Sequence, residues 1–134
     1  MTYLLDSNAC IALLSDGDSN VKEQLKLVGV ANVTICSIVV AELAYGVERS
    51  SPKRRADNRI RLEMFQRKIP SLPFDDNAAH EYGRIRAHLA SLGTPIGPND
   101  LMIASIALAN NLTLITHNTA EFSRIPALQL EDWQ

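Results

Sequence analysis

The acidic residues of this chain lie beside its most apolar segments, where an ionised side chain is hardest to accommodate. Asp6 directly follows a short apolar run, Glu42 is the only charged residue between Ala31 and Val47, and Asp100 opens another apolar run. A carboxylate in such surroundings is destabilising unless something neutralises it. Because one divalent cation can neutralise several carboxylates, the pattern predicts a shared metal site.

A fourth polar segment, residues 117–121, follows the apolar residues 113–115 and adds Asn118 and Glu121. Carboxylate and amide oxygens are ligands that Mg²⁺ prefers. Two such ions about 4 Å apart can activate a water and stabilise the leaving oxygen of a phosphodiester. Without metal the carboxylates repel one another, so the pKa of at least one of them should rise.

The elements that must position these residues alternate along the chain. Strands are expected near residues 3–5, 32–36, 72–74, 112–115 and 128–130, and helices at 9–14, 19–28, 37–47, 54–68, 75–92 and 98–109. Such alternation predicts a parallel sheet with helices on both faces. In these α/β folds, ligands bind outside the carboxyl ends of the strands.

Asp6 and the segment 116–121 each follow a predicted strand, so both should lie at that edge of the sheet. Glu42 and Asp100 fall near the starts of helices that can point toward the same edge. Each acid also has an ordinary explanation: Asp6 as a helix cap, Glu42 and Glu121 as surface residues, Asp100 as a first-turn acid that the helix dipole favours, and Asn118 as a turn residue. The consistent placement of three acids favours the shared site.

Composition sets the broad class. The 134 residues suit one domain spanning residues 1–134, and no apolar run reaches the roughly 18 residues of a membrane span. The start of the chain does not resemble a signal peptide. Cys10 and Cys36 lie in apolar segments without CxxC spacing, so we expect structural thiols and a cytoplasmic protein.

The charge is distributed unevenly along the chain. Residues 49–68 carry a formal charge of +6, whereas the rest of the chain carries −8. A basic patch beside an acidic centre is typical of a metal-dependent enzyme that acts on a polyanion, and an ordinary solvated helix explains it equally well. The candidate nucleic-acid contacts are Lys53, Arg54, Arg55 and Arg59.

Four segments in order also resemble a known family. Residues 4–8 (LLDSN), 37–46 (SIVVAELAYG), 97–104 (GPNDLMIA) and 116–122 (THNTAEF) resemble the successive motifs of PIN-domain ribonucleases, and 131–133 (EDW) resembles their usual end. Each motif alone is weak, but the set covers almost the whole chain. Within the family the chain is most similar to the VapC toxins of bacterial toxin–antitoxin pairs, including the branch described as initiator-tRNA endonucleases.

The resemblance implies an α/β PIN-like fold, with a central parallel β-sheet flanked by α-helices, and an endoribonuclease dependent on Mg²⁺ or Mn²⁺. By position, Asp6 and Asp100 are the implied main metal ligands and Glu42 a third acid. Many relatives have Asp where this chain has Asn118, so Glu121 is a candidate to supply the missing charge. Ser7, Asn8 and Ser37 are implied to position water or phosphate around these ligands.

The resemblance further implies an RNA substrate, with initiator tRNA as a candidate, a homodimer, and a VapB-like antitoxin as inhibitor. An arginine of that partner would pair with the carboxylates, and the apolar residues Ile11, Leu13, Leu14 and Leu25 are candidates for its groove. Three alternatives remain: a housekeeping PIN nuclease, a non-catalytic RNA- or protein-binding module, and a phosphatase of the haloacid dehalogenase type. The phosphatase is disfavoured because its second Asp is Asn8 here and no lysine follows Lys68.

Overall fold

The computed structural model describes residues 1–134 and is built on a five-stranded sheet with strand order β3-β2-β1-β4-β5. All neighbouring strands are parallel, as the alternation of elements predicted. The strands are β1 (Tyr3–Leu5), β2 (Val33–Cys36), β3 (Ser71–Leu72), β4 (Thr113–Ile115) and β5 (Leu130–Glu131). β1 therefore lies at the centre, with β2 and β4 on either side.

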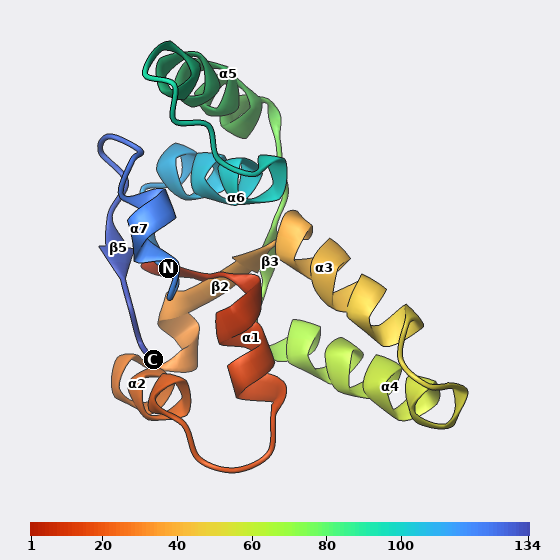
Figure 1. Cartoon of the computed structure of the whole chain (residues 1–134). Coiled ribbons are helices and arrows are strands. Elements are labelled where there is room, and N and C mark those ends of the chain that lie inside the picture. Colours follow the sequence, from red (N-terminus) through yellow and green to blue (C-terminus); the bar gives the residue numbers. More distant parts are fainter.

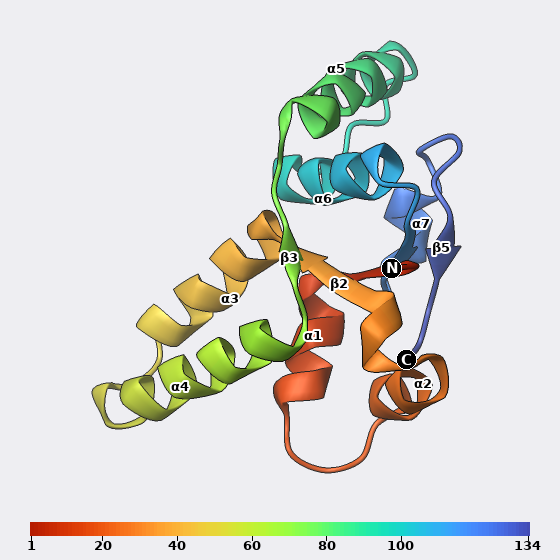
Figure 2. The same ribbon diagram turned by 180° about the vertical axis from the view of Figure 1, so that it is seen from behind.

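Helices cover both faces of this sheet. They are α1 (Ser7–Leu14), α2 (Asn20–Val28), α3 (Ser37–Glu48), α4 (Pro52–Lys68), α5 (Asp76–Ser91), α6 (Pro98–Ala109) and α7 (Thr119–Phe122), with a 3₁₀ turn, η1, at Val30–Asn32. α5 and α6 lie on one side of the sheet, and α1 and α2 lie on the other (Figures 1 and 2). α3 and α4 form an antiparallel pair that projects away from the sheet.

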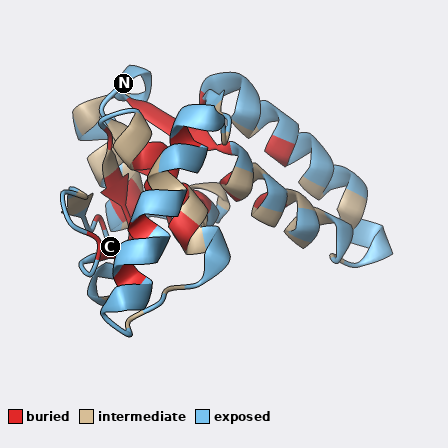
Figure 3. Ribbon diagram, turned by 90° about the horizontal axis from the view of Figure 1, so that it is seen from above, coloured by how far each residue is buried: buried red, intermediate tan, exposed pale blue.

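The core lies between the sheet and its helices, as the burial pattern in Figure 3 shows. Leu4, Ile35 and Leu114, on the three middle strands, are fully buried, because helices cover these strands on both faces. Trp133 packs edge to face on Tyr3, with ring centroids 5.2 Å apart, and so attaches the end of the chain to β1. The two cysteines are buried and unpaired, as predicted.

Four details differ from the sequence prediction. Helix α7 was not predicted, since four residues are too few to show a helical period. The last strand is Leu130–Glu131 rather than 128–130, because Ala127 has a φ of 67° and places a turn there. β3 is Ser71–Leu72 rather than 72–74. Helix α1 begins at Ser7 rather than at residue 9, with Asp6 as its N-cap.

No helix is both long enough and apolar enough to cross a bilayer.

Candidate active site

Asp6 lies where the central strand β1 passes into α1, and it is only 7% exposed. Its Oδ1 accepts a hydrogen bond of 2.9 Å from the backbone N–H of Ala9, which caps the helix. Burial raises the pKa of Asp6, while hydrogen bonds from Ala9, Thr116 and Asn8 oppose the rise and the charge of Asp132 adds to it. Asp6 is therefore a helix cap, as the ordinary explanation held, and also a buried acid at the sheet edge.

Thr116, at the end of β4, supports Asp6 from the neighbouring strand. Its side chain hydrogen-bonds to the Asp6 carboxyl, and its Oγ1 accepts a hydrogen bond of 3.0 Å from the Asn118 N–H. Thr116 is 1% exposed. Sequence reasoning did not single out Thr116, although a hydroxyl directly after a strand that ends at the site was a usable signal.

Asp100, in the first turn of α6, shows that the acids lie close together. Burial, followed by the charges of Glu121, Glu42 and Asp6, raises the pKa of Asp100 to about 6. Acids from three other chain segments thus lie near enough for their charges to act on Asp100. The pKa of Asp100 thus rises in the predicted direction, with burial as the largest cause and the neighbouring charges adding to it.

Glu42 is the acid that α3 contributes to this centre, from the second turn of that helix. The residue is half-buried, and its Oε1 is shielded from solvent without any hydrogen-bond partner. A shielded carboxylate oxygen with no donor is destabilising, so a cation at this position would stabilise it.

Glu121 and Asn118 complete the group from the loop after β4. Glu121 Oε1 accepts a hydrogen bond of 3.2 Å from the Gly97 N–H, and its Oε2 accepts one of 2.9 Å from Asn118 Nδ2. The carboxylate of Glu121 lies close enough to Asp100 to raise that residue's pKa. Asn118 itself is exposed and donates its amide to Glu121.

Comparisons with known proteins identify the family of this chain. Residues 3–128 match the PIN domain family. The chain is 40% identical to Ribonuclease VapC2 of Rickettsia felis over 134 residues, which cover 99% of this chain and 98% of that protein. This chain belongs to the VapC ribonucleases, a PIN-domain family.

Two further matches come from Salmonella typhimurium. The VapC described as a tRNA(fMet)-specific endonuclease is 38% identical over 133 residues, which cover 99% of this chain and 98% of that one. A crystal structure of DNA-bound VapBC superposes with a TM-score of 0.92 at 37% identity, covering 100% of this chain and 99% of that chain. The predicted family and fold class are confirmed, and the phosphatase alternative is wrong.

The oxygen donors of this VapC fit a divalent cation. Glu42 Oε1 and Ser7 Oγ are both shielded and lack hydrogen-bond partners. No three His, Cys, Asp or Glu side chains already converge as ligands of one ion, however. The charges of Glu121, Glu42 and Asp6 nevertheless act on Asp100, so these four carboxylates form one acidic centre.

The smaller predicted residues have separate surroundings. Ser7, the first residue of α1, keeps its hydroxyl free beside Asp6, and the Asn8 N–H hydrogen-bonds to Asp6. Ser37 Oγ instead accepts a hydrogen bond of 3.2 Å from the Phe74 N–H. Ser37 therefore secures the segment between β3 and α5.

His117 and Asp132 form a pair at the rim of the site. His117 Nδ1 lies 2.9 Å from Asp132 Oδ2. Asp132 also adds to the negative field around Asp6. Nothing in the sequence pattern separated Asp132 from an ordinary residue near the end of the chain.

The four basic residues predicted to contact nucleic acid all lie on α4, but they do not share one environment. Arg59 pairs with Glu48 at 2.7 Å, and Arg55 donates a hydrogen bond of 3.2 Å to the Ser50 carbonyl. Lys53 is exposed, and Arg54 faces a groove. Lys53 and Arg54 are therefore the most available of the four for phosphate.

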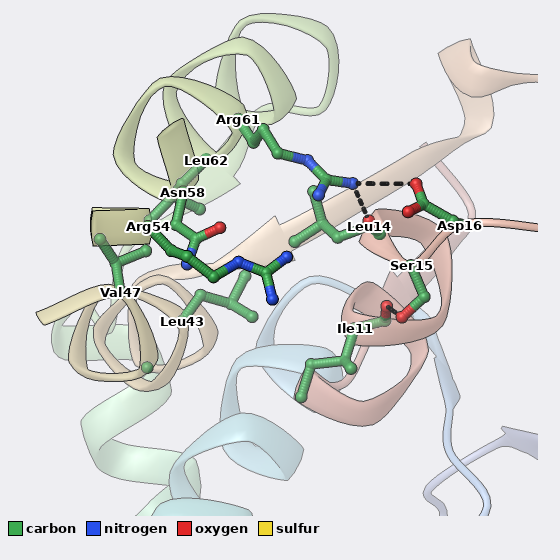
Figure 4. A pocket seen from close by; sticks show the side chains of 11 residues that line it. Ile11, Leu14, Ser15, Asp16, Leu43, Val47, Arg54, Asn58, Arg61 and Leu62 are labelled. Atoms are coloured by element: carbon green, nitrogen blue, oxygen red, sulfur yellow. Dashed lines mark hydrogen bonds and ion pairs between the residues drawn. The ribbon is translucent and has the colours of Figure 1, made fainter. Parts of the chain in front are cut away.

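That groove, of about 420 Å³, lies between α1, α3 and α4 (Figure 4). Its apolar lining includes Ile11, Leu14, Leu43 and Leu62. Arg61 crosses it, donating a hydrogen bond to the Leu14 carbonyl and lying 3.8 Å from Asp16 Oδ1. Of the four residues proposed for a partner groove, Ile11 and Leu14 lie here, whereas Leu13 and Leu25 line a second hollow.

Proposed function

We propose that this VapC is the toxin of a toxin–antitoxin pair and cleaves RNA as a metal-dependent endoribonuclease. The observation that carries the proposal is Asp100, whose carboxyl lies within the electrostatic reach of Glu121, Glu42 and Asp6 at the carboxyl edge of a parallel sheet. An acidic centre of this kind binds cations rather than the polyanionic substrate directly. The relatives' description as ribonucleases supports the same chemistry.

Asp6, Asp100 and Glu42 are the proposed ligands of Mg²⁺ or Mn²⁺. When bound, such an ion activates water and stabilises the charge that develops on the phosphodiester oxygens. The cap at Ala9 and the Thr116 hydroxyl hold Asp6 in place, which limits the reorganisation needed for binding. Glu121 adds negative charge that Asn118 cannot supply.

The proposed substrate is RNA, with initiator tRNA as the first candidate because a 38% identical relative is described as tRNA(fMet)-specific. Lys53 and Arg54 are available to contact phosphates on the way to the acidic centre. We also propose that the protein acts in the cytoplasm, where its proposed tRNA substrate is found.

The proposed partner is a VapB-like antitoxin. Similar solved structures are VapBC complexes from Rickettsia felis and Salmonella typhimurium, described as bound to DNA. In this chain the groove beside Ile11 and Leu14 has both apolar and charged lining and so suits an amphipathic helix, and an arginine of the partner can pair with the acidic centre. We also propose that the toxin is a homodimer.

Two experiments test this proposal. Purified protein should cut initiator tRNA in Mg²⁺ faster than elongator methionine tRNA, and EDTA should stop the cleavage. Expression of the chain alone should arrest bacterial growth, and co-expression of the neighbouring gene should restore it. If the purified protein cleaves RNA but its expression does not arrest growth, the toxin assignment is wrong and a housekeeping nuclease is the better assignment.

A further inference from the structure

Tyr45 is an aromatic side chain that the fold leaves open to solvent. It is 67% exposed, whereas the other two tyrosines, the three phenylalanines and the tryptophan are buried or half-buried. Aromatic side chains bury large areas when they serve stability. An exposed tyrosine on a well-packed helix therefore invites an explanation outside the core.

Arg49, the C-cap residue that directly follows α3, accompanies this ring. Its guanidinium carbon lies 5.5 Å from the centroid of the Tyr45 ring. The Arg49 side chain makes no ion pair and no hydrogen bond, so its donors are free. The pair thus presents an oriented ring together with an unneutralised cation.

The helical period connects this pair to the acidic centre. Glu42, Tyr45 and Arg49 are spaced i, i+3 and i+7, so they share one face of α3. With a rise of about 1.5 Å per residue, Tyr45 lies about 4.5 Å and Arg49 about 10 Å along the axis from Glu42. The residues of α3 that line the groove, Leu43 and Val47, lie on a different face.

We propose that Tyr45 and Arg49 form a stacking platform that holds a nucleotide base of the RNA beside the acidic centre. The inference rests on the proposed ribonuclease function and names how that site holds its substrate. Single-stranded RNA is recognised by stacking of splayed bases on aromatic rings and on arginine planes. Tyr45 supplies the ring, and Arg49 supplies both a cation over that ring and donors for a phosphate. Both are positioning residues, since the acids carry the chemistry.

The test is a binding measurement with single-stranded RNA that contains 2-aminopurine, whose fluorescence falls when it stacks. The protein carries Asp100→Asn so that it binds without cutting. Tyr45→Ala should weaken binding about 10-fold and remove the quenching, because one base stack is lost. Tyr45→Phe should keep both the affinity and the quenching. Tyr45→Leu, which is apolar but cannot stack, should lose the quenching.

Ile60→Ala is the matched control, since Ile60 is 54% exposed on α4 and should leave binding unchanged. Quenching that survives in Tyr45→Leu, or full affinity in Tyr45→Ala, would overturn the platform. In cleavage assays with Asp100 restored, Tyr45→Ala should raise KM more than it lowers kcat. If the wild-type protein cuts RNA and Tyr45→Ala has the same KM and kcat, the proposed stacking platform is wrong but the proposed nuclease function is not. If the wild-type protein neither binds nor cuts RNA, both proposals are wrong.

Discussion

Glu121 joins α7 to the start of α6, because its Oε1 accepts a hydrogen bond of 3.2 Å from the Gly97 N–H. Gly97 is the N-cap of the helix that carries Asp100 in its first turn. Glu121 therefore brings charge close to Asp100 and also fixes the position of that helix. Asn118 has neither property, since it donates its amide to Glu121.

Glu121→Gln should therefore cost more cleavage activity than Asn118→Ala. The glutamine can keep the hydrogen bond to Gly97 but removes the negative charge, and we expect a loss of about 10- to 100-fold. The measurement is the initial rate of RNA cleavage at several Mn²⁺ concentrations. Equal losses, or a larger loss for Asn118→Ala, would reverse the order of the two residues.

The main acids could be predicted because a charge beside an apolar run is visible in the sequence. Asp6, Glu42 and Asp100 stand out in this way, and parallel-sheet geometry placed them together. Thr116 did not stand out, since a threonine after an apolar run is also an ordinary strand residue. Asp132 escaped for a different reason: its contact with His117 joins two segments that no local pattern connects.

The partners of the basic residues were equally hidden. Arg59 looks like a free cation in the sequence, but the turn between α3 and α4 brings Glu48 to it. Helix contacts of this kind depend on how the two helices pack, which the sequence pattern does not specify. The same packing creates the groove beside Ile11.

Without metal, the stability of the fold should fall as the pH rises from about 4 to about 6. The pKa of Asp100 is raised from 3.8 to about 6, so in this window the folded protein keeps a proton that the unfolded chain has released. Burial raises the pKa of Asp6 and acts in the same direction. Asp100→Asn lacks its share of this penalty and should melt at a higher temperature than wild type above about pH 6.

Melting curves in EDTA at about pH 4 and about pH 7 check this prediction. The advantage of Asp100→Asn over wild type should grow with pH. If wild type and Asp100→Asn differ in melting temperature by the same amount at both pH values, the pKa of Asp100 is not raised in the folded protein.

Lys53→Ala should weaken RNA binding and reduce the slope of log affinity against log salt by about 1. Converting Lys53, Arg54 and Arg55 to Ala together should reduce the slope by about 2, because Lys53 and Arg54 are the two available cations. Fewer phosphate contacts mean that RNA binding releases fewer counterions. Lys26→Ala is the control, since Lys26 is an exposed lysine on α2 that pairs with Glu23. If Lys53→Ala and Lys26→Ala change the slope equally, α4 is only a solvated face.

Ile11→Asp should release the toxin from its antitoxin while leaving RNA cleavage intact. Ile11 is 51% exposed and lines the groove between α1, α3 and α4, so a carboxylate there would be buried against an apolar partner helix. We expect at least about 10-fold weaker inhibition in a cleavage assay titrated with antitoxin. Ile60→Asp, at an equally exposed position away from this groove, is the control. Normal inhibition of Ile11→Asp would place the partner elsewhere.

The most direct test of the acidic centre is RNA cleavage by wild type and Asp100→Asn in Mg²⁺, in Mn²⁺ and in EDTA, with a melting curve for each protein. Wild type should cut RNA with either ion and should stop in EDTA. Asp100→Asn should remain folded and lose more than about 100-fold in rate, since it removes a metal ligand rather than a supporting contact. A folded Asp100→Asn protein that cuts RNA at the wild-type rate would contradict the assignment of the metal site.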